Sequence, residues 1–217
     1  MNNINTNSIQ GIMKLDPQNA TIIGCGSIGS KIAIELARLG INELELWDDD
    51  TVEPHNLCNQ VFTEDQIEQP KVIALKEKLT EICSVKVVCN TKKFKKENTP
   101  EHNIVFLCVD SMTQRKLLMK ELLCCSNIEW VIETRMGKDA MAVYTVNAPR
   151  QEKWKESSQY DDSTAEVSPC GLSVSVGAIS TIVAGLATWQ YMVIHKEEIP
   201  KFEILVDLYP HMGMIVT

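Results

Sequence analysis

The sequence of 217 residues has no CxxC cysteine pair, no excess of positive charge and no apolar segment near its N-terminus. Most of its eight cysteines lie within apolar runs, as reduced core residues of cytoplasmic proteins do. The net charge of −8 argues against a broad nucleic-acid-binding face. We therefore expect a cytoplasmic protein without a secretory signal and without a nucleic-acid partner.

Charged residues are also absent from one long segment, which runs from Cys170 to His195. A run of this length could cross a bilayer. However, it contains several serines and threonines and one glutamine, which are unfavourable in a membrane span. The composition favours a fully buried helix, in the core or at a dimer seam, and we expect no membrane association.

Apolar runs alternate with segments of helical periodicity through the first half of the chain. The predicted strands there are 20–24, 43–47, 85–89 and 104–109, and the predicted helices are 28–39, 70–82 and 112–125. This alternation predicts an α/β fold, with a Rossmann-like, doubly wound and mostly parallel sheet. The later predicted strands, 130–133, 141–146, 202–208 and 212–216, lie closer together and indicate an antiparallel C-terminal extension. Because no linker interrupts the pattern, we expect a single domain over 1–217, with a flexible N-terminal arm over 1–18.

A glycine motif, Gly24-Cys25-Gly26-Ser27-Ile28-Gly29, lies between the first predicted strand and the first predicted helix. Glycine is needed where the chain turns sharply, where backbone approaches a phosphate and where helix packs on strand. Asp48 follows the second predicted strand, about 20 residues further on, where an acidic side chain can bind ribose hydroxyls. These features predict a nucleotide site, and by themselves they fit NAD as well as ATP.

The residues after Asp48 resemble the DxDxVxxxNLxRQ stretch of the ThiF/MoeB/HesA family, whose fold is shared with ubiquitin-activating enzymes. In this chain the stretch reads DDDTVEPHNLCNQ, from Asp48 to Gln60, and the QPK segment that ends at Lys71 follows it. Further matching segments come in the same order up to residue 216: they contain Asp110 with Arg115, Arg135, and the sequence Cys170-Gly171-Leu172. The resemblance implies a single ThiF/MoeB-like nucleotide-binding domain, in which 150–169 is a crossover-type loop over the substrate.

The resemblance further implies adenylation of a C-terminal carboxylate with ATP and Mg²⁺. Positive and metal-binding groups must then stabilise the crowded phosphate. The implied catalytic residues are Lys71, Asp110, Arg115 and Arg135. The implied nucleotide-binding residues are Gly24, Gly26, Gly29, Asp48, Asp50, Asn56, Asn59, Gln60, Lys71 and Asp110, of which Asp110 holds the Mg²⁺. Structural roles remain open for several of them: helix N-caps for Asp50 and Asp110, a surface lysine for Lys71, and ion-pair partners for Arg115 and Arg135.

The chain departs from the family pattern at three places. Asn59 replaces an arginine that contacts phosphate in the family, and no arginine precedes Arg38. The paired CxxC motifs that bind structural zinc in many members are absent, so we expect no zinc site. Cys170 lies near the place of a nucleophilic cysteine in some relatives, although a buried small residue is the better explanation.

The sequence therefore predicts an ATP-dependent adenylyltransferase that acts on a small ubiquitin-like protein, a sulfur-carrier protein or a peptide, and that forms a homodimer. A non-catalytic nucleotide-binding or scaffold subunit, which needs a partner for its arginines, is the alternative that Asn59 motivates. An NAD-dependent oxidoreductase is a third hypothesis, supported only by the glycine motif and Asp48.

Overall fold

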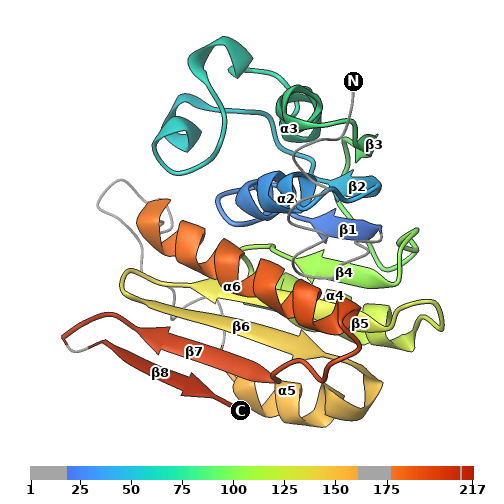
Figure 1. Cartoon of the computed structure of the whole chain (residues 1–217), viewed down its shortest axis with the longest axis vertical. Coiled ribbons are helices and arrows are strands. Elements are labelled where there is room, and N and C mark those ends of the chain that lie inside the picture. The colour runs from blue at the N-terminus through green and yellow to red at the C-terminus, as the bar shows by residue number, and fades with distance from the viewer. Residues whose placement is uncertain (1–18, 161–176, 211) are drawn as a thin grey trace.

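The computed structural model describes residues 19–160, 177–210 and 212–217, which form one eight-stranded sheet with helices on both faces (Figure 1). Cys170, the predicted arm 1–18 and the second part of the predicted loop 150–169, from 161 to 169, lie outside the described residues. The strands are β1 Ala20–Ile23, β2 Glu43–Trp47, β3 Lys86–Asn90, β4 Ile104–Leu107, β5 Trp130–Met136, β6 Ala140–Val146, β7 Glu203–Asp207 and β8 Gly213–Val216. The α-helices are α2 Gly29–Arg38, α3 Lys71–Ile82, α4 Met112–Cys124, α5 Gln151–Ser157 and α6 Gly177–His195, and the 3-10 helices are η1 Pro54–Cys58, η2 Glu64–Gln66 and η3 Ala148–Arg150.

The strand order is β3-β2-β1-β4-β5-β6-β7-β8. Strands β3, β2, β1, β4 and β5 pair in parallel, whereas β5 to β8 pair antiparallel. The predicted doubly wound sheet with an antiparallel C-terminal extension is thus confirmed. The chain leaves β1 for β2 on one side and reaches β4 on the other, so the crevice between β1 and β4 lies at the point where strand order reverses. Open α/β sheets bind their ligands at such points.

Alternate residues of the central strands supply two separate hydrophobic cores. Ile22 of β1 belongs to the core under α2, α3 and α6, and its neighbour Ile23 belongs to the core under α4 and α5. Both faces of the parallel strands are therefore covered, which explains why 104–107 is apolar at every position. This burial fixes the strand register, and with it the positions of the loops at the carboxyl ends of the strands.

Two expected elements differ from those observed. The segment after Arg150 was expected to be a loop, yet its described part begins with helix α5. Trp154 is the only buried residue of this helix, so no apolar periodicity announced it. Strand β5 also continues beyond Glu133 to Met136, because its last residues pair with β6.

Helix α6 is the one helix among the described residues with the length and composition of a membrane span, a test that core helices also pass. It packs along α2, β5 and β6 (Figure 1). Its residues Tyr191 and Val183 are buried. The expectation of a fully buried helix is wrong for the single chain, because Ile182 and Trp189 on its outer face are 41% and 50% exposed.

Candidate functional site

A cleft of about 1850 Å³ opens at the carboxyl ends of β1, β2 and β4 and extends across β5 to β8. Every predicted site residue lines it, apart from Gly29, which lies at the start of α2, and Cys170, which lies outside the described residues. These lining residues are Gly24, Gly26, Asp48, Asp50, Asn56, Asn59, Gln60, Lys71, Asp110, Arg115 and Arg135. The structure therefore brings together side chains that are up to 111 positions apart in the sequence, from Gly24 to Arg135.

The three glycines of the motif meet different constraints. Gly24 has a φ of +93°, and a Cβ atom there would lie 2.8 Å from the carbonyl oxygen of Cys108. At Gly29 a Cβ atom would overlap the carbonyl oxygen of Gly24, because the helix starts directly against the strand. A Cβ atom at Gly26 would meet no atom of the described residues within 4 Å, although Gly26 lines the cleft. Gly24 and Gly29 are thus required by the fold, whereas Gly26 leaves room for a ligand close to the backbone.

Asp48 is fixed at the end of β2 by two backbone groups. Its carboxylate accepts hydrogen bonds from the amide of Cys25, at 2.6 Å, and from the amide of Asp50, at 2.9 Å. Burial raises the pKa of this carboxyl group, and the nearby Lys71 ammonium opposes that rise. The side chain is therefore held rigidly beside the glycine loop, as ribose recognition requires.

Lys71 lies at the start of α3, and its Nζ atom is 2.7 Å from Oδ2 of Asp50. The lysine side chain is 8% exposed, whereas the Asp50 side chain is 65% exposed. A cation in the first turn of a helix is unfavourable for the helix dipole, so the position needs another explanation. Since Asp50 is largely solvated, an anionic ligand can replace it as the partner of Lys71. The hypothesis of a plain surface lysine is wrong.

The segment around η1 places its amide side chains along one wall of the cleft. The carbonyl oxygen of the Asn56 side chain accepts a hydrogen bond from the Glu53 amide, which leaves the Asn56 amide group as its donor for a ligand. The Gln60 Oε1 atom is buried and has no hydrogen-bond partner among the described residues. Asn56 therefore has a structural function in capping η1, in addition to its predicted function.

Lys31 is a residue that supports one wall of the site and that the sequence did not suggest. Its ammonium donates to the carbonyl oxygens of Asn59 at 2.8 Å and of Gly177 at 3.0 Å, and to the hydroxyl of Ser180. Ser27, inside the glycine motif, also donates to Asn59. Burial lowers the pKa of Lys31. The lysine thus ties the Asn59 segment to the start of α6. An unusual cation in the first turn of α2 was the signal that could have indicated it.

Asp110 lies just beyond β4 and is exposed to the cleft. The N-cap of α4 is its neighbour Ser111, whose hydroxyl accepts a hydrogen bond from the Gln114 amide. The alternative of a helix-capping function for Asp110 is therefore wrong. Asp50 likewise caps no helix, since the N-caps nearest to it are Glu53 and Pro70. An exposed carboxylate at this place is free to bind Mg²⁺ together with phosphate oxygens.

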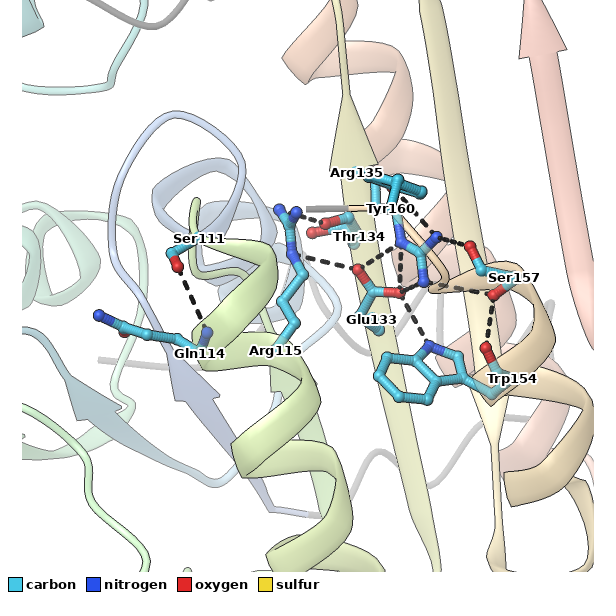
Figure 2. A network of polar contacts seen from close by, with 9 residues as sticks. All are labelled: Ser111, Gln114, Arg115, Glu133, Thr134, Arg135, Trp154, Ser157 and Tyr160. Atoms are coloured by element: carbon cyan, nitrogen blue, oxygen red, sulfur yellow. Dashed lines mark hydrogen bonds and ion pairs between the residues drawn. The ribbon is translucent and has the colours of Figure 1, made fainter. Parts of the chain in front are cut away.

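Arg115 and Arg135 converge on a fully buried carboxylate, that of Glu133 on β5 (Figure 2). The Nε atom of Arg115 is 3.2 Å from Glu133, and the Arg135 guanidinium makes contacts of 2.8 to 2.9 Å with it. The indole N–H of Trp154 also donates a hydrogen bond to this carboxylate, at 3.1 Å. Burial opposes the charge of Arg135, but the adjacent Glu133 raises its pKa above the usual value.

The two arginines thus have structural ion-pair partners, as one of the two open interpretations held. Arg115 also donates to the carbonyl oxygen of Thr134, so it fastens α4 to β5. Arg135 donates to Ser157 and Tyr160 and stacks over Tyr144, with its guanidinium carbon 4.2 Å from the ring centre. Both still line the cleft. Because one carboxylate serves two guanidinium groups, the network keeps a net positive charge toward a ligand.

The thiols in and next to the cleft differ in exposure. Burial raises the pKa of Cys108 to about 12 and raises that of Cys25, whereas Cys58 is exposed. At pH 8 about 10⁻⁴ of Cys108 is ionised, since its pKa is four units higher, and only the thiolate is reactive. We expect iodoacetamide to label Cys58 in the folded protein and to leave Cys25 and Cys108 unlabelled, as measured by peptide mass spectrometry.

Mg-ATP should slow the labelling of Cys58, because Cys58 lines the cleft. Cys124 is the control: it is exposed at the end of α4, outside the cleft, so its labelling rate should not change. Equal Cys58 labelling rates with and without saturating ATP would contradict a nucleotide at this wall.

Comparison with known proteins agrees with the fold and with the order of the site segments. The model of the ThiF family matches residues 2–204. The chain is 30% identical over 115 residues to the sulfur carrier protein ThiS adenylyltransferase of Escherichia coli, which covers 50% of this chain and 46% of that protein. It is 30% identical over 135 residues to the adenylyltransferase and sulfurtransferase MOCS3 of Xenopus laevis, which covers 56% of this chain and 30% of that protein. The match spans less than half the length of either relative.

Solved structures share the architecture at low sequence identity. Escherichia coli MccB with MccA-N7isoASN superposes with a TM-score of 0.78 at 18% identity, over 100% of this chain and 72% of that one. MccB with AMPCPP and MccA gives a TM-score of 0.76 at 20% identity, over 100% of this chain and 72% of that one. PaaA gives a TM-score of 0.74 at 18% identity, over 99% of this chain and 68% of that one. The match of the family model over nearly the whole chain, together with this shared fold, shows that the chain belongs to the ThiF family.

Proposed function

We propose that this protein adenylates the C-terminal carboxylate of a small carrier protein or peptide, with ATP as the second substrate and Mg²⁺ as the metal. The proposal rests chiefly on one observation: buried Lys71 points into the same cleft as Asp110 and the open face of Gly26. A lysine whose carboxylate partner is exposed, next to backbone that leaves space, is suited to hold phosphate groups.

Each part of the cleft has a distinct task in this proposal. Asp48 receives the ribose, and Gly26 lets the nucleotide approach the backbone. Asn56, Asn59 and Gln60 offer amide groups to the phosphates, and Asp110 binds the Mg²⁺. Lys71 stabilises the negative charge that develops on the attacked phosphate.

The size of the cleft supports a second, macromolecular substrate. Pockets for small ligands usually measure about 300–1,000 Å³, and this cleft is larger. Beyond the glycine loop its walls continue along Tyr144, Tyr160, Leu205 and Gly213, far from Asp48. An extended C-terminal tail could lie there and present its carboxylate near Lys71. The ThiS adenylyltransferases and the MccB–MccA structures among the relatives name a carrier protein and a peptide as such partners.

ATP–pyrophosphate exchange tests the proposal directly. We expect exchange that depends on an added carrier protein or peptide with a free C-terminal carboxylate. A matched carrier whose C-terminus is amidated should give none, because the nucleophile is missing. Tight ATP binding without exchange, across a panel of candidate carriers, would favour the alternative of a non-catalytic subunit, which Asn59 and the arginine-poor N-terminal region motivate.

Ligand-dependent melting separates ATP from NAD. A ligand at 100 times its Kd stabilises the folded state by about 2.7 kcal/mol, which corresponds to a rise of about 5 to 11 °C in Tm for a domain of this size. We expect such a rise with ATP and Mg²⁺, and a smaller one with ATP and EDTA. Stabilisation by NAD alone would instead support the oxidoreductase hypothesis.

Location and assembly remain predictions from the sequence. We propose a cytoplasmic homodimer in which α6 lies near the seam, and the exposed Ile182 and Trp189 on the outer face of that helix support the choice of surface. Sedimentation analysis of the wild type and of Trp189→Glu measures whether the chain forms a dimer and whether this surface is needed for it.

A further inference from the structure

A second group of charged side chains lies at the end of β2 opposite to the cleft. Glu43 is the first residue of β2, whereas Asp48 follows its last residue. Glu101 and His102 precede β4 and lie beside Glu43. One potential ligand atom from each of these three residues lies within 4.8 Å of the other two. The group has no part in the proposed adenylation, so its arrangement needs a separate explanation.

His102 is the unusual member of this group. It is 8% exposed, and its Nε2 atom is buried without a hydrogen-bond partner among the described residues. The nearest carboxylate oxygen, Oε1 of Glu43, is 3.8 Å away, which is too far for a hydrogen bond. Buried polar groups in native proteins are nearly always paired, so an imidazole nitrogen left in this state indicates a missing ligand.

The backbone around His102 is held in place by another residue. The buried carboxylate of Glu45 accepts hydrogen bonds from the Glu101 amide, at 2.9 Å, and from the Thr21 hydroxyl, at 2.7 Å. The segment before β4 is therefore fixed without any contribution from the side chains of Glu101 and His102. These side chains are already assembled, and they remain available for a ligand. Such preorganisation is what a binding site requires.

The charges of the group favour a cation. Two carboxylates, Glu43 and Glu101, face one ammonium, that of Lys86, whose Nζ atom is 2.8 Å from Oε2 of Glu43. This hydrogen bond raises the pKa of Lys86. Lys86 is exposed and occupies only one oxygen of Glu43, so Oε1 is left toward His102.

We propose that Glu43, Glu101 and His102 bind a divalent transition-metal ion, with Zn²⁺ as the representative, and that water completes the coordination. One imidazole nitrogen and two carboxylate oxygens are ligands that Zn²⁺ accepts, at about 2.0–2.2 Å each. Ligand atoms around such an ion lie roughly 3.3 Å apart, so the 3.8 Å between Glu43 and His102 needs to close only slightly. The site contains no sulfur, and it is therefore different from the four-cysteine zinc site that the sequence lacks.

The function of this ion would be structural. It joins the start of β2 to the segment before β4, at the end of the strands opposite to the proposed nucleotide site. Metal binding should therefore raise the melting temperature, because the ion binds the folded state alone. The proposal is independent of adenylation, and its tests need no activity assay.

Titration of the metal-free full-length protein with Zn²⁺, by calorimetry and by thermal shift, tests the site. The titration is made in saturating Mg²⁺, which occupies the acidic cluster at Asp48. The protein is first treated with iodoacetamide, so that the exposed thiols cannot bind Zn²⁺. We expect one Zn²⁺ per chain and a higher Tm. His102→Gln should weaken binding at least about tenfold, since it removes the nitrogen ligand. His55→Gln is the matched control: this histidine is exposed and pairs with Glu53, so binding should not change.

Two further variants make the outcome decisive. Lys86→Gln removes the competing cation from Glu43 and should tighten Zn²⁺ binding. Glu101→Gln changes an exposed residue, so it carries the test if His102→Gln does not fold, and it should also weaken binding. Unchanged affinity in both Glu101→Gln and His102→Gln, or weaker binding in Lys86→Gln, would overturn the proposal.

Discussion

Replacing Lys71 by alanine is expected to reduce carrier-dependent ATP–pyrophosphate exchange by about 10²–10³-fold, the loss typical when one group that stabilises transition-state charge is removed. Lys71 is buried in the cleft, and its Asp50 partner is solvated, so the ammonium is available to a phosphate. The fold should survive, because the variant leaves behind an exposed carboxylate rather than a buried one. Exchange kinetics, together with the circular dichroism spectrum, measure both effects.

Lys76→Ala is the control for Lys71→Ala, since Lys76 lies on the same helix but is exposed outside the cleft. Its exchange rate should equal that of the wild type. Asp110→Ala should abolish exchange at low Mg²⁺, and high Mg²⁺ should restore at most a small part of it. Full activity in both Lys71→Ala and Asp110→Ala would refute the proposed site.

Replacing Glu133 by alanine is expected to lower the stability of the fold by about 3–5 kcal/mol, the usual cost of removing one partner from a buried ion pair. Arg115 and Arg135 would lose their shared carboxylate, and Trp154 would lose its acceptor. For a domain of this size the loss corresponds to a fall in Tm of about 6 to 20 °C. Calorimetry or denaturant unfolding measures it.

Glu129→Ala is the matched control for Glu133→Ala. Glu129 lies near the start of the same strand and accepts a hydrogen bond from Asn103, but this pair is exposed, so Tm should change little. Glu133→Gln keeps the shape and one acceptor oxygen, and its Tm should lie between those of the wild type and Glu133→Ala. A wild-type Tm in Glu133→Ala would show that the arginines find other partners.

The order of elements was predictable because the parallel strands are buried on both faces. Their apolar runs, such as 104–107, are visible in the sequence without any knowledge of their neighbours. Helix α5 was missed because only one of its residues, Trp154, is buried, so the helix has no apolar periodicity. The far end of β5 was missed for a related reason, since only its pairing with β6 makes it a strand.

The site was predictable where residues lie next to a motif in the sequence, as Asp48 does, and less so where long-range contacts decide. Gly26, Lys71 and Asp110 line one cleft as predicted. The ion pairs of Arg115 and Arg135 depend on Glu133, and no local sequence pattern indicates that Glu133 is buried. Lys31 was missed because its acceptors come from two segments 118 residues apart, Asn59 and Gly177.

The unequal constraints on the glycines bear on how such a chain can diverge. Gly24 and Gly29 are held by contacts within the polypeptide itself, so they must persist in any descendant that keeps this sheet and helix. A Cβ atom at Gly26 would contact no other described residue, so packing within the described part of the chain does not require glycine there. A lineage that lost its nucleotide could therefore accept a side chain at Gly26 while it retained the other two glycines. Glycine at this one position therefore meets a requirement of the proposed ligand, separate from the requirements of packing.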